Sequence, residues 1–330
     1  MEEAQQPQKQ LQPEVLICRE PPSFSVIGEQ AFTSTKFRFL KAYESPLPLH
    51  QFLATRAQSV RAILSSGGAP VTADLLQFLP SVRLVVTTSA GLNQIDIPEC
   101  RRRGIAIANS GNVYSPDVAD LAVGLLIDVW RNISASNRYV RQGLWLTEGD
   151  YPLGVKLRGK QVGIVGLGNI GLEVAKRLEV FGCYISYTSR KTKPHVSYPF
   201  YQNVTELAAN CDALIICCGL TDETRHMIDK EVLSALGKKG VVVNIGRGAI
   251  IDEKELVRCL VAGEIAGAGL DVFENEPIVP QELLKLDNVV LSPHCAVFTP
   301  ESMKDVSKLV VGNLEAFFSG EALLTEYLDD

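Results

Sequence analysis

A glycine-rich turn in the middle of the chain constrains the fold most. The apolar stretch Val162–Val165 runs into the pattern Gly166-x-Gly168-x-x-Gly171, and a segment of helical character follows. Strand, glycine turn and helix in this order are the context that a dinucleotide-binding turn requires. Gly166 would make the turn, Gly168 would let the backbone approach a pyrophosphate, and Gly171 would let the helix pack on the strand. An ordinary strand-to-helix turn is the alternative.

Short apolar runs alternate with helical segments on both sides of this turn. The runs that we interpret as strands are residues 15–18, 37–40, 62–65, 84–88 and 105–108 before the turn, and 184–187, 213–218, 241–245, 267–272 and 289–292 after it. Such alternation indicates parallel sheets with crossover helices. A strongly apolar helix is expected over residues 117–132, and a C-terminal helix with one apolar side over 301–318.

Because the turn begins mid-chain, a different domain must precede it. We predict an α/β protein with two doubly wound parallel-sheet domains, a Rossmann-type nucleotide domain inserted in a flavodoxin-like substrate domain. The expected boundaries are a disordered tail over residues 1–13, a substrate domain over 14–113 plus 298–330, and a dinucleotide-binding domain over 114–297. A chain of 330 residues is long enough for two domains.

Composition excludes several classes of function. The net charge of −6 argues against a nucleic-acid partner, because phosphate contacts need a basic surface. No uncharged apolar stretch is long enough to span a bilayer. The eight cysteines show no C-x-x-C spacing, which favours reduced thiols in the cytoplasm over a disulfide framework or a metal site.

Three polar residues follow three of the predicted strands. Arg247, Glu276 and His294 each lie just after an apolar run, where doubly wound sheets bind ligands. An arginine binds a carboxylate through two parallel hydrogen bonds, and a carboxylate beside a histidine favours the protonated ring. Together they suit the reduction of a 2-oxo acid. A structural histidine and a surface arginine are the simpler alternatives for each residue taken alone.

The order of four motifs resembles the D-isomer-specific 2-hydroxyacid dehydrogenases. These motifs are Gly166-Leu-Gly-x-Ile-Gly171, Asn244-Ile-Gly-Arg-Gly248, Gly267-x-Gly-Leu-Asp-Val-Phe-Glu-x-Glu-Pro277 and Pro293-His294. The resemblance runs from about residue 60 to the end. Within the family the chain is most similar to the plant hydroxypyruvate/glyoxylate reductases and to the hydroxyphenylpyruvate reductases. These relatives imply a homodimer formed through the nucleotide domain, and a place in photorespiration.

The resemblance also implies roles for single residues. Arg247 would bind the substrate carboxylate and carbonyl oxygen, His294 would donate the proton, and Glu276 rather than Glu274 would partner His294. Asp271 would bind the nicotinamide carboxamide. The backbone N–H groups of Ala90 and Gly91 would take the substrate carboxylate, as glycine loops can present amides to an anion. The chain departs from these reductases after His294, where Val297 and Phe298 are bulkier than the family's small residues.

The second strand of the nucleotide unit indicates which cofactor binds. An NAD enzyme carries an acid at its end, whereas this chain has Ser189, Arg190 and Lys191 there, which favours the 2′-phosphate of NADPH over NADH. A solvated basic turn is the alternative. The predicted cofactor set is Gly166, Leu167, Gly168, Asn169, Ile170, Gly171, Ser189, Arg190, Lys191, Ile245, Gly246, Arg247, Asp271, His294, Cys295 and Ala296.

The sequence therefore predicts an NADPH-dependent oxidoreductase of small 2-oxo acids. It would reduce hydroxypyruvate to D-glycerate and glyoxylate to glycolate, and 4-hydroxyphenylpyruvate is a further candidate. No metal, nucleic acid or membrane partner is expected. Two alternatives stay open: an NAD-linked dehydrogenase of another 2-hydroxy acid, and a nucleotide-sensing, non-catalytic interaction protein of the same fold.

Overall fold

The computed structural model describes residues 12–328, which divide into two compact units. The central unit is Ser115–Val297; the split unit comprises the described residues up to Tyr114 and those from Phe298 onward. The predicted tail, residues 1–13, lies outside the described residues except at its end. There, Gln12 donates from Nε2 to the Thr35 carbonyl at 2.7 Å, and Pro13 accepts a backbone hydrogen bond from Arg38.

The split unit is built on a five-stranded parallel sheet with the strand order β2-β1-β3-β4-β5. Its central strands read as continuous apolar runs because helices cover both faces. Its elements are β1 (Glu14–Ile17), α1 (Pro22–Ile27), η1 (Glu29–Phe32), β2 (Arg38–Lys41), η2 (Ala42–Glu44), α2 (Leu49–Arg56), β3 (Ala62–Ser65), α3 (Ala73–Leu76), β4 (Leu84–Thr87), α4 (Ile97–Arg102), β5 (Ala106–Ala108) and α12 (Pro300–Ser319).

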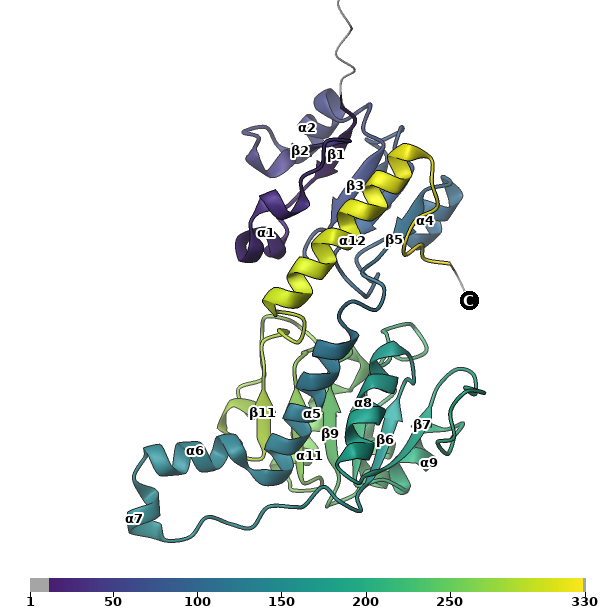
Figure 1. Ribbon diagram of the computed structural model, residues 1–330. Coiled ribbons are helices and arrows are strands. Elements are labelled where there is room, and N and C mark those ends of the chain that lie inside the picture. Colours follow the sequence, from purple (N-terminus) through teal and green to yellow (C-terminus); the bar gives the residue numbers. More distant parts are fainter. Residues whose placement is uncertain (1–11, 329–330) are drawn as a thin grey trace, which may run out of the picture. The chain divides into compact units, whose positions relative to one another are not determined.

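Helix α12 returns the end of the chain to the split unit. Thr299 caps its start by accepting a hydrogen bond from the Ser302 N–H, Pro300 occupies the first turn, and Gly320 ends it in the left-handed conformation. The helix packs against α1, η1 and β4 and crosses one face of the sheet, as Figure 1 shows in yellow. Its apolar side is thus covered within the split unit.

The central unit contains a six-stranded parallel sheet with the order β11-β10-β9-β8-β6-β7. Its elements are α5 (Ser115–Arg131), α6 (Ile133–Arg141), α7 (Leu144–Glu148), β6 (Gln161–Val165), α8 (Asn169–Val180), β7 (Tyr184–Thr188), α9 (Val204–Ala209), β8 (Ala213–Ile216), α10 (Lys230–Leu236), β9 (Val241–Asn244), η3 (Gly248–Ile250), α11 (Glu253–Val261), β10 (Gly267–Leu270), η4 (Leu283–Lys285) and β11 (Val289–Leu291). The predicted fold class of two parallel-sheet α/β domains is confirmed.

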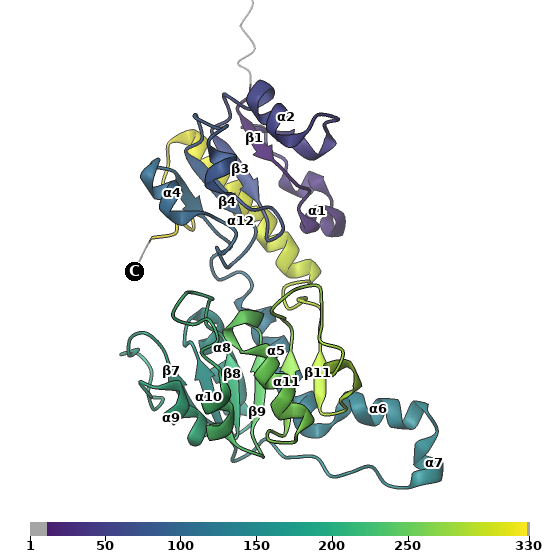
Figure 2. The same ribbon diagram turned by 180° about the vertical axis from the view of Figure 1, so that it is seen from behind.

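Helices cover both faces of the central sheet. Helices α5 and α8 lie together on the face seen in Figure 1, and α9, α10 and α11 lie on the opposite face seen in Figure 2. An isolated parallel bridge between Tyr187 and Phe200 adds one residue pair beyond the edge strand β7. The chain order reverses at β6, which lies between β7 and β8. Ligands of doubly wound sheets bind outside the carboxyl ends of the strands at such a point.

Helices α6 and α7 form an arm that projects away from the central sheet, as Figures 1 and 2 both show. The arm and the segment that follows it expose large apolar side chains: in α7, Trp145 is 63% and Leu146 92% exposed, and after α7, Leu153 is 97% exposed. Among the helices in residues 12–328, none combines the length and apolar character needed to cross a membrane.

Candidate active site

The glycine turn has the geometry that its sequence predicts. Gly166 follows β6 with φ +96°, and a Cβ there would lie 2.7 Å from Cys218 at the end of β8. A Cβ on Gly171 would lie 2.3 Å from the Gly166 carbonyl oxygen, so only glycine lets α8 pack this closely on the turn. The space beside Gly168 is open, and no side chain of residues 12–328 caps the first N–H groups of α8. An anionic pyrophosphate fits this arrangement of free donors.

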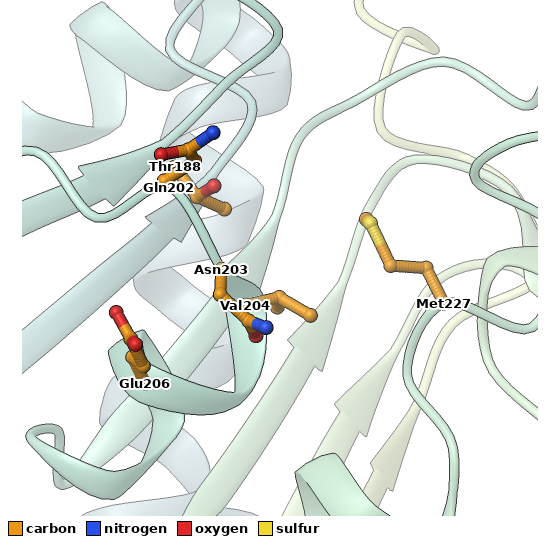
Figure 3. Close-up of a pocket in the computed structure, with 6 residues that line it drawn as sticks. All are labelled: Thr188, Gln202, Asn203, Val204, Glu206 and Met227. Atoms are coloured by element: carbon orange, nitrogen blue, oxygen red, sulfur yellow. The ribbon is translucent and has the colours of Figure 1, made fainter.

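A hollow of about 520 Å³ lies beside the end of β7. Figure 3 shows Val204 and Met227 on opposite sides of it, and Thr188 and Gln202 also line it. Asn203 and Glu206 complete its lining. No local sequence pattern indicates this hollow, because its walls come from three segments that only the fold brings together.

A basic turn follows β7 directly. The Ser189 hydroxyl donates to the Lys191 carbonyl at 2.6 Å, and the Lys193 N–H donates to the Tyr187 hydroxyl at 2.8 Å. These bonds fix the backbone of the turn and leave the side chains of Arg190 and Lys191 exposed. Within residues 12–328, no acidic side chain pairs with either cation, so both charges are available to an anion.

His294 and Glu276 form a hydrogen-bonded pair at the carboxyl ends of β11 and β10. His294 Nδ1 lies 2.7 Å from Glu276 Oε2, and Glu276 Oε1 accepts from the Phe273 N–H at 3.1 Å. Burial alone would raise the pKa of Glu276. The hydrogen bonds from His294 and Phe273, with the charges of His294 and Arg247, outweigh burial and hold that pKa below its ordinary value. Glu276 is therefore a carboxylate at neutral pH.

Arg247 follows β9, and hydrogen bonds hold both its backbone carbonyl and its guanidinium group. Asn244 donates from Nδ2 to the Arg247 carbonyl at 3.0 Å and accepts from the Gly246 N–H, while Arg247 Nη1 donates to the Gly246 carbonyl at 2.7 Å. Burial lowers the pKa of Arg247, and the Glu276 charge opposes that shift. The buried Asn244 thus shapes the arginine turn, a role that the motif containing it did not reveal.

Asp271 organises the loop that carries His294. Its Oδ1 accepts from the Ser292 hydroxyl at 2.6 Å and from the Cys295 N–H at 2.9 Å, and its Oδ2 accepts from the Ala296 N–H at 3.2 Å. Its backbone carbonyl accepts from the His294 N–H at 2.7 Å. The carboxylate was expected to bind a nicotinamide carboxamide, but three of its roughly four acceptor positions already hold the loop.

The remaining predicted cofactor residues lie around these groups. Ile245 is buried after β9, and a Cβ on Gly246 would lie 2.7 Å from the Cys218 carbonyl. Burial and the nearby Asp271 raise the pKa of the Cys295 thiol. Phe298, where the chain departs from the family pattern, is 48% exposed and belongs to the split unit.

The loop after β4 presents two free backbone donors in the split unit. The carbonyls of Thr88 and Ala90 accept hydrogen bonds from the Tyr114 hydroxyl and from Asn109 Nδ2. No acceptor among residues 12–328 receives the Ala90 or Gly91 N–H. The buried hydroxyls of Ser66 and Ser110, after β3 and β5, also have no hydrogen-bond partner there. Adjacent free N–H groups on a glycine loop suit a carboxylate.

Comparisons with known proteins agree with this geometry. The D-isomer-specific 2-hydroxyacid dehydrogenase NAD-binding domain matches residues 123–296. A glyoxylate/hydroxypyruvate reductase of Arabidopsis thaliana is 54% identical over 95% of this chain and 97% of its own length. A hydroxyphenylpyruvate reductase of Plectranthus scutellarioides is 49% identical over 88% and 92%.

Solved structures show the same relationship. The NADPH-dependent glyoxylate/hydroxypyruvate reductase of Sinorhizobium meliloti, in complex with NADP and malonate, superposes with a TM-score of 0.86 at 36% identity, covering 96% of this chain and 97% of that one. The chain belongs to the D-isomer-specific 2-hydroxyacid dehydrogenase family.

Proposed function

We propose that this protein reduces small 2-oxo acids, hydroxypyruvate and glyoxylate above all, with NADPH as the hydride source. The observation that carries the proposal is the pair of His294 Nδ1 and Glu276 Oε2 at 2.7 Å, in the same unit as the glycine turn. The names of the similar reductases support this substrate class. A cytosolic location and a role in photorespiration stay predictions, the first from the eight free cysteines and the second from the resemblance alone.

His294 and Arg247 have separate roles in the proposed reduction of the carbonyl group. A bound NADPH, whose pyrophosphate the glycine turn would hold, would supply the hydride to the keto carbon. His294 keeps Nδ1 on Glu276, which leaves Nε2 to give a proton to the forming alkoxide. Arg247 stabilises the negative charge on that oxygen and binds the substrate carboxylate.

A substrate panel tests the proposal directly. Hydroxypyruvate, glyoxylate and 4-hydroxyphenylpyruvate are each added to the full chain with NADPH or NADH, and cofactor oxidation is followed by absorbance. We expect NADPH oxidation with at least hydroxypyruvate and glyoxylate. A protein that binds NADPH but oxidises none with any of the three would be a nucleotide sensor, and the proposed enzyme activity would be wrong.

We expect the turn after β7 to select NADPH. The double substitution Ser189→Asp and Arg190→Ala removes a cation and a hydroxyl and introduces a carboxylate that repels a 2′-phosphate. Each lost charge-assisted hydrogen bond should cost about 1.5–3 kcal/mol, which would appear mainly as a higher KM for NADPH. The measurement is kcat/KM for both cofactors, with Lys239→Ala as an exposed control.

A preference for NADH in the unchanged protein would contradict this assignment. One observation favours that outcome: the Glu206 carboxylate lines the hollow beside Thr188 and could accept from a ribose 2′-hydroxyl. Glu206→Gln separates the two cases. It should weaken NADH binding if Glu206 binds the ribose, and leave NADPH binding unchanged or improved if the basic turn decides.

The exposed arm supports a homodimer that forms through the central unit. Leu146 and Leu153 would not remain 92% and 97% exposed without cost in water, because buried apolar area contributes roughly 25 cal/mol per Å². We expect the protein to sediment at twice its chain mass of 36.0 kDa, and Leu146→Glu to yield monomers at micromolar concentration. Val180→Glu is the matched control, since Val180 is 88% exposed outside the arm. A monomeric parent protein would refute the arm's role.

A further inference from the structure

A second histidine–carboxylate pair lies next to the proposed acid. His226 Nε2 is 2.8 Å from Glu274 Oε1, and Glu274 is two residues from Glu276 in the same loop. We propose that His226 is a positioning residue for the reduction: through Glu274 it holds the loop 272–277 so that Glu276 stays on His294. This inference rests on the proposed function, because it assigns His226 a role in the same proton transfer.

The backbone around His226 is fixed in an unusual conformation. His226 has φ +52°, a left-handed value that non-glycine residues rarely adopt, and His294 has φ +51°. The His226 N–H donates to the Ala249 carbonyl at 2.9 Å, and the Ile228 N–H donates to the Ile250 carbonyl at 3.0 Å. Such a conformation persists only where surrounding contacts over-determine it. His226 is therefore anchored to the segment that follows Arg247.

Val272 and Phe273 bury the start of the loop 272–277, whereas its polar attachments among residues 12–328 are few. The Glu274 N–H donates to Glu253 Oε2 at 3.0 Å, and the Phe273 N–H binds Glu276 itself. A Cβ on Gly248 would lie 1.9 Å from the Phe273 carbonyl carbon, so the loop backbone touches the arginine turn directly. His226 and Glu253 supply the side-chain contacts to Glu274, and His226 is the one that contacts the Glu274 carboxylate.

The carboxyl groups around Glu274 explain why this contact matters. Burial raises the pKa of Glu253, and the Glu274 carboxylate raises it further while the Glu274 N–H lowers it. Glu253, Glu274 and Glu276 thus bring three carboxyl groups to one loop, with His226, His294 and Arg247 as the facing cations or potential cations. Without the hydrogen bond between His226 and Glu274, repulsion between the Glu253 and Glu274 carboxyl groups would let the loop move, and Glu276 would leave His294 for part of the time.

His226 also joins this loop to the hollow beside β7. Its neighbour Met227 lines that hollow, where Figure 3 shows its side chain reaching towards Val204. The pair His226–Glu274 therefore connects a wall of the hollow to the loop that carries Glu276. A substitution in the wall of the hollow should therefore affect the loop 272–277, and a substitution in that loop should affect the hollow.

The expected signature is a shift in pH dependence. Reduction needs the protonated His294 ring, so activity is present at low pH and is lost as the ring deprotonates. Less contact with the Glu276 carboxylate stabilises the protonated ring less, so the alkaline limb moves to lower pH. Because the His226 side chain is 42% exposed, we expect a shift of roughly half a pH unit and a loss in kcat of about 3–10-fold at neutral pH.

The test is a set of pH–rate profiles on the full chain with NADPH and hydroxypyruvate. His226→Ala and Glu274→Gln, which break the pair from opposite sides, should both shift the alkaline limb to lower pH. His226→Gln, which can still donate to Glu274, should restore most of the parent profile. His195→Ala, an exposed histidine in a polar loop, is the control and should change nothing.

The combined variant His226→Ala/Glu276→Gln gives the decisive comparison. If His226 acts through Glu276, adding His226→Ala to Glu276→Gln should produce no further shift. Equal shifts in both backgrounds, or unchanged profiles in His226→Ala and Glu274→Gln alongside a shifted Glu276→Gln profile, would overturn the inference and leave the proposed function intact. An unchanged profile in Glu276→Gln would instead overturn the proposed role of Glu276, and this inference with it.

Discussion

Replacing His294 with alanine is expected to lower kcat for the reduction of hydroxypyruvate by about 10²–10⁴, the usual contribution of a positioned general acid. Water cannot replace a proton donor that is fixed on Glu276 at 2.7 Å. Binding of NADPH should be nearly unchanged, because the glycine turn and the basic turn are untouched. Rapid-mixing kinetics for the hydride step and fluorescence titration of NADPH measure the two effects separately.

Alanine at this position changes the backbone preference as well as the chemistry, since His294 has φ +51°. His294→Asn tolerates the left-handed conformation better and so controls for backbone strain. The rate of the hydride step should fall to a similar degree in both variants. A variant that retains activity within tenfold of the parent would show that another group donates the proton.

Arg247→Gln is expected to reduce kcat/KM for hydroxypyruvate by about 10²–10³, similar to the loss of one donor to a developing oxyanion. Glutamine retains a donor at shorter reach but loses the charge and the forked geometry. Arg247→Lys should recover only part of this loss, because an ammonium group cannot bind a carboxylate through two parallel hydrogen bonds. Arg56→Gln, on the exposed side of α2, is the matched control. If the Arg247 variants change kcat but leave the KM for hydroxypyruvate unchanged, Arg247 stabilises the developing oxyanion and does not bind the substrate carboxylate.

The sequence predicted the strands well because buried parallel strands read as short apolar runs. Their ends were less certain: the expected strand over 213–218 stops at Ile216, where Cys217 and Cys218 turn towards the glycine turn. Several short helices were missed, α6, α7 and α9 among them. Helices of five to nine residues show too few turns for periodicity, and the arm exposes apolar residues that a pattern would assign to a core.

For the site, the sequence predicted which residues follow the strands but not their contacts. The carboxyl ends of parallel strands meet at one edge, so Arg247, Glu276 and His294 were expected near each other. The partners of Glu274 and Asn244, and the walls of the hollow, depend on loop conformations that no local pattern encodes. The resemblance named Glu276 as the partner of His294. Only the coordinates show that Glu274 is engaged by a different histidine.

The hydrogen bonds of Asp271 have a consequence for how variants of this protein are interpreted. His294 follows β11 in the chain, yet Asp271, at the end of β10, holds the residues on both sides of it. The orientation of His294 is therefore set by Asp271, at the end of the neighbouring strand β10. A substitution that only loosens β10 would reproduce the kinetic defect of an active-site variant, so loss of activity alone cannot identify which residues meet the substrate.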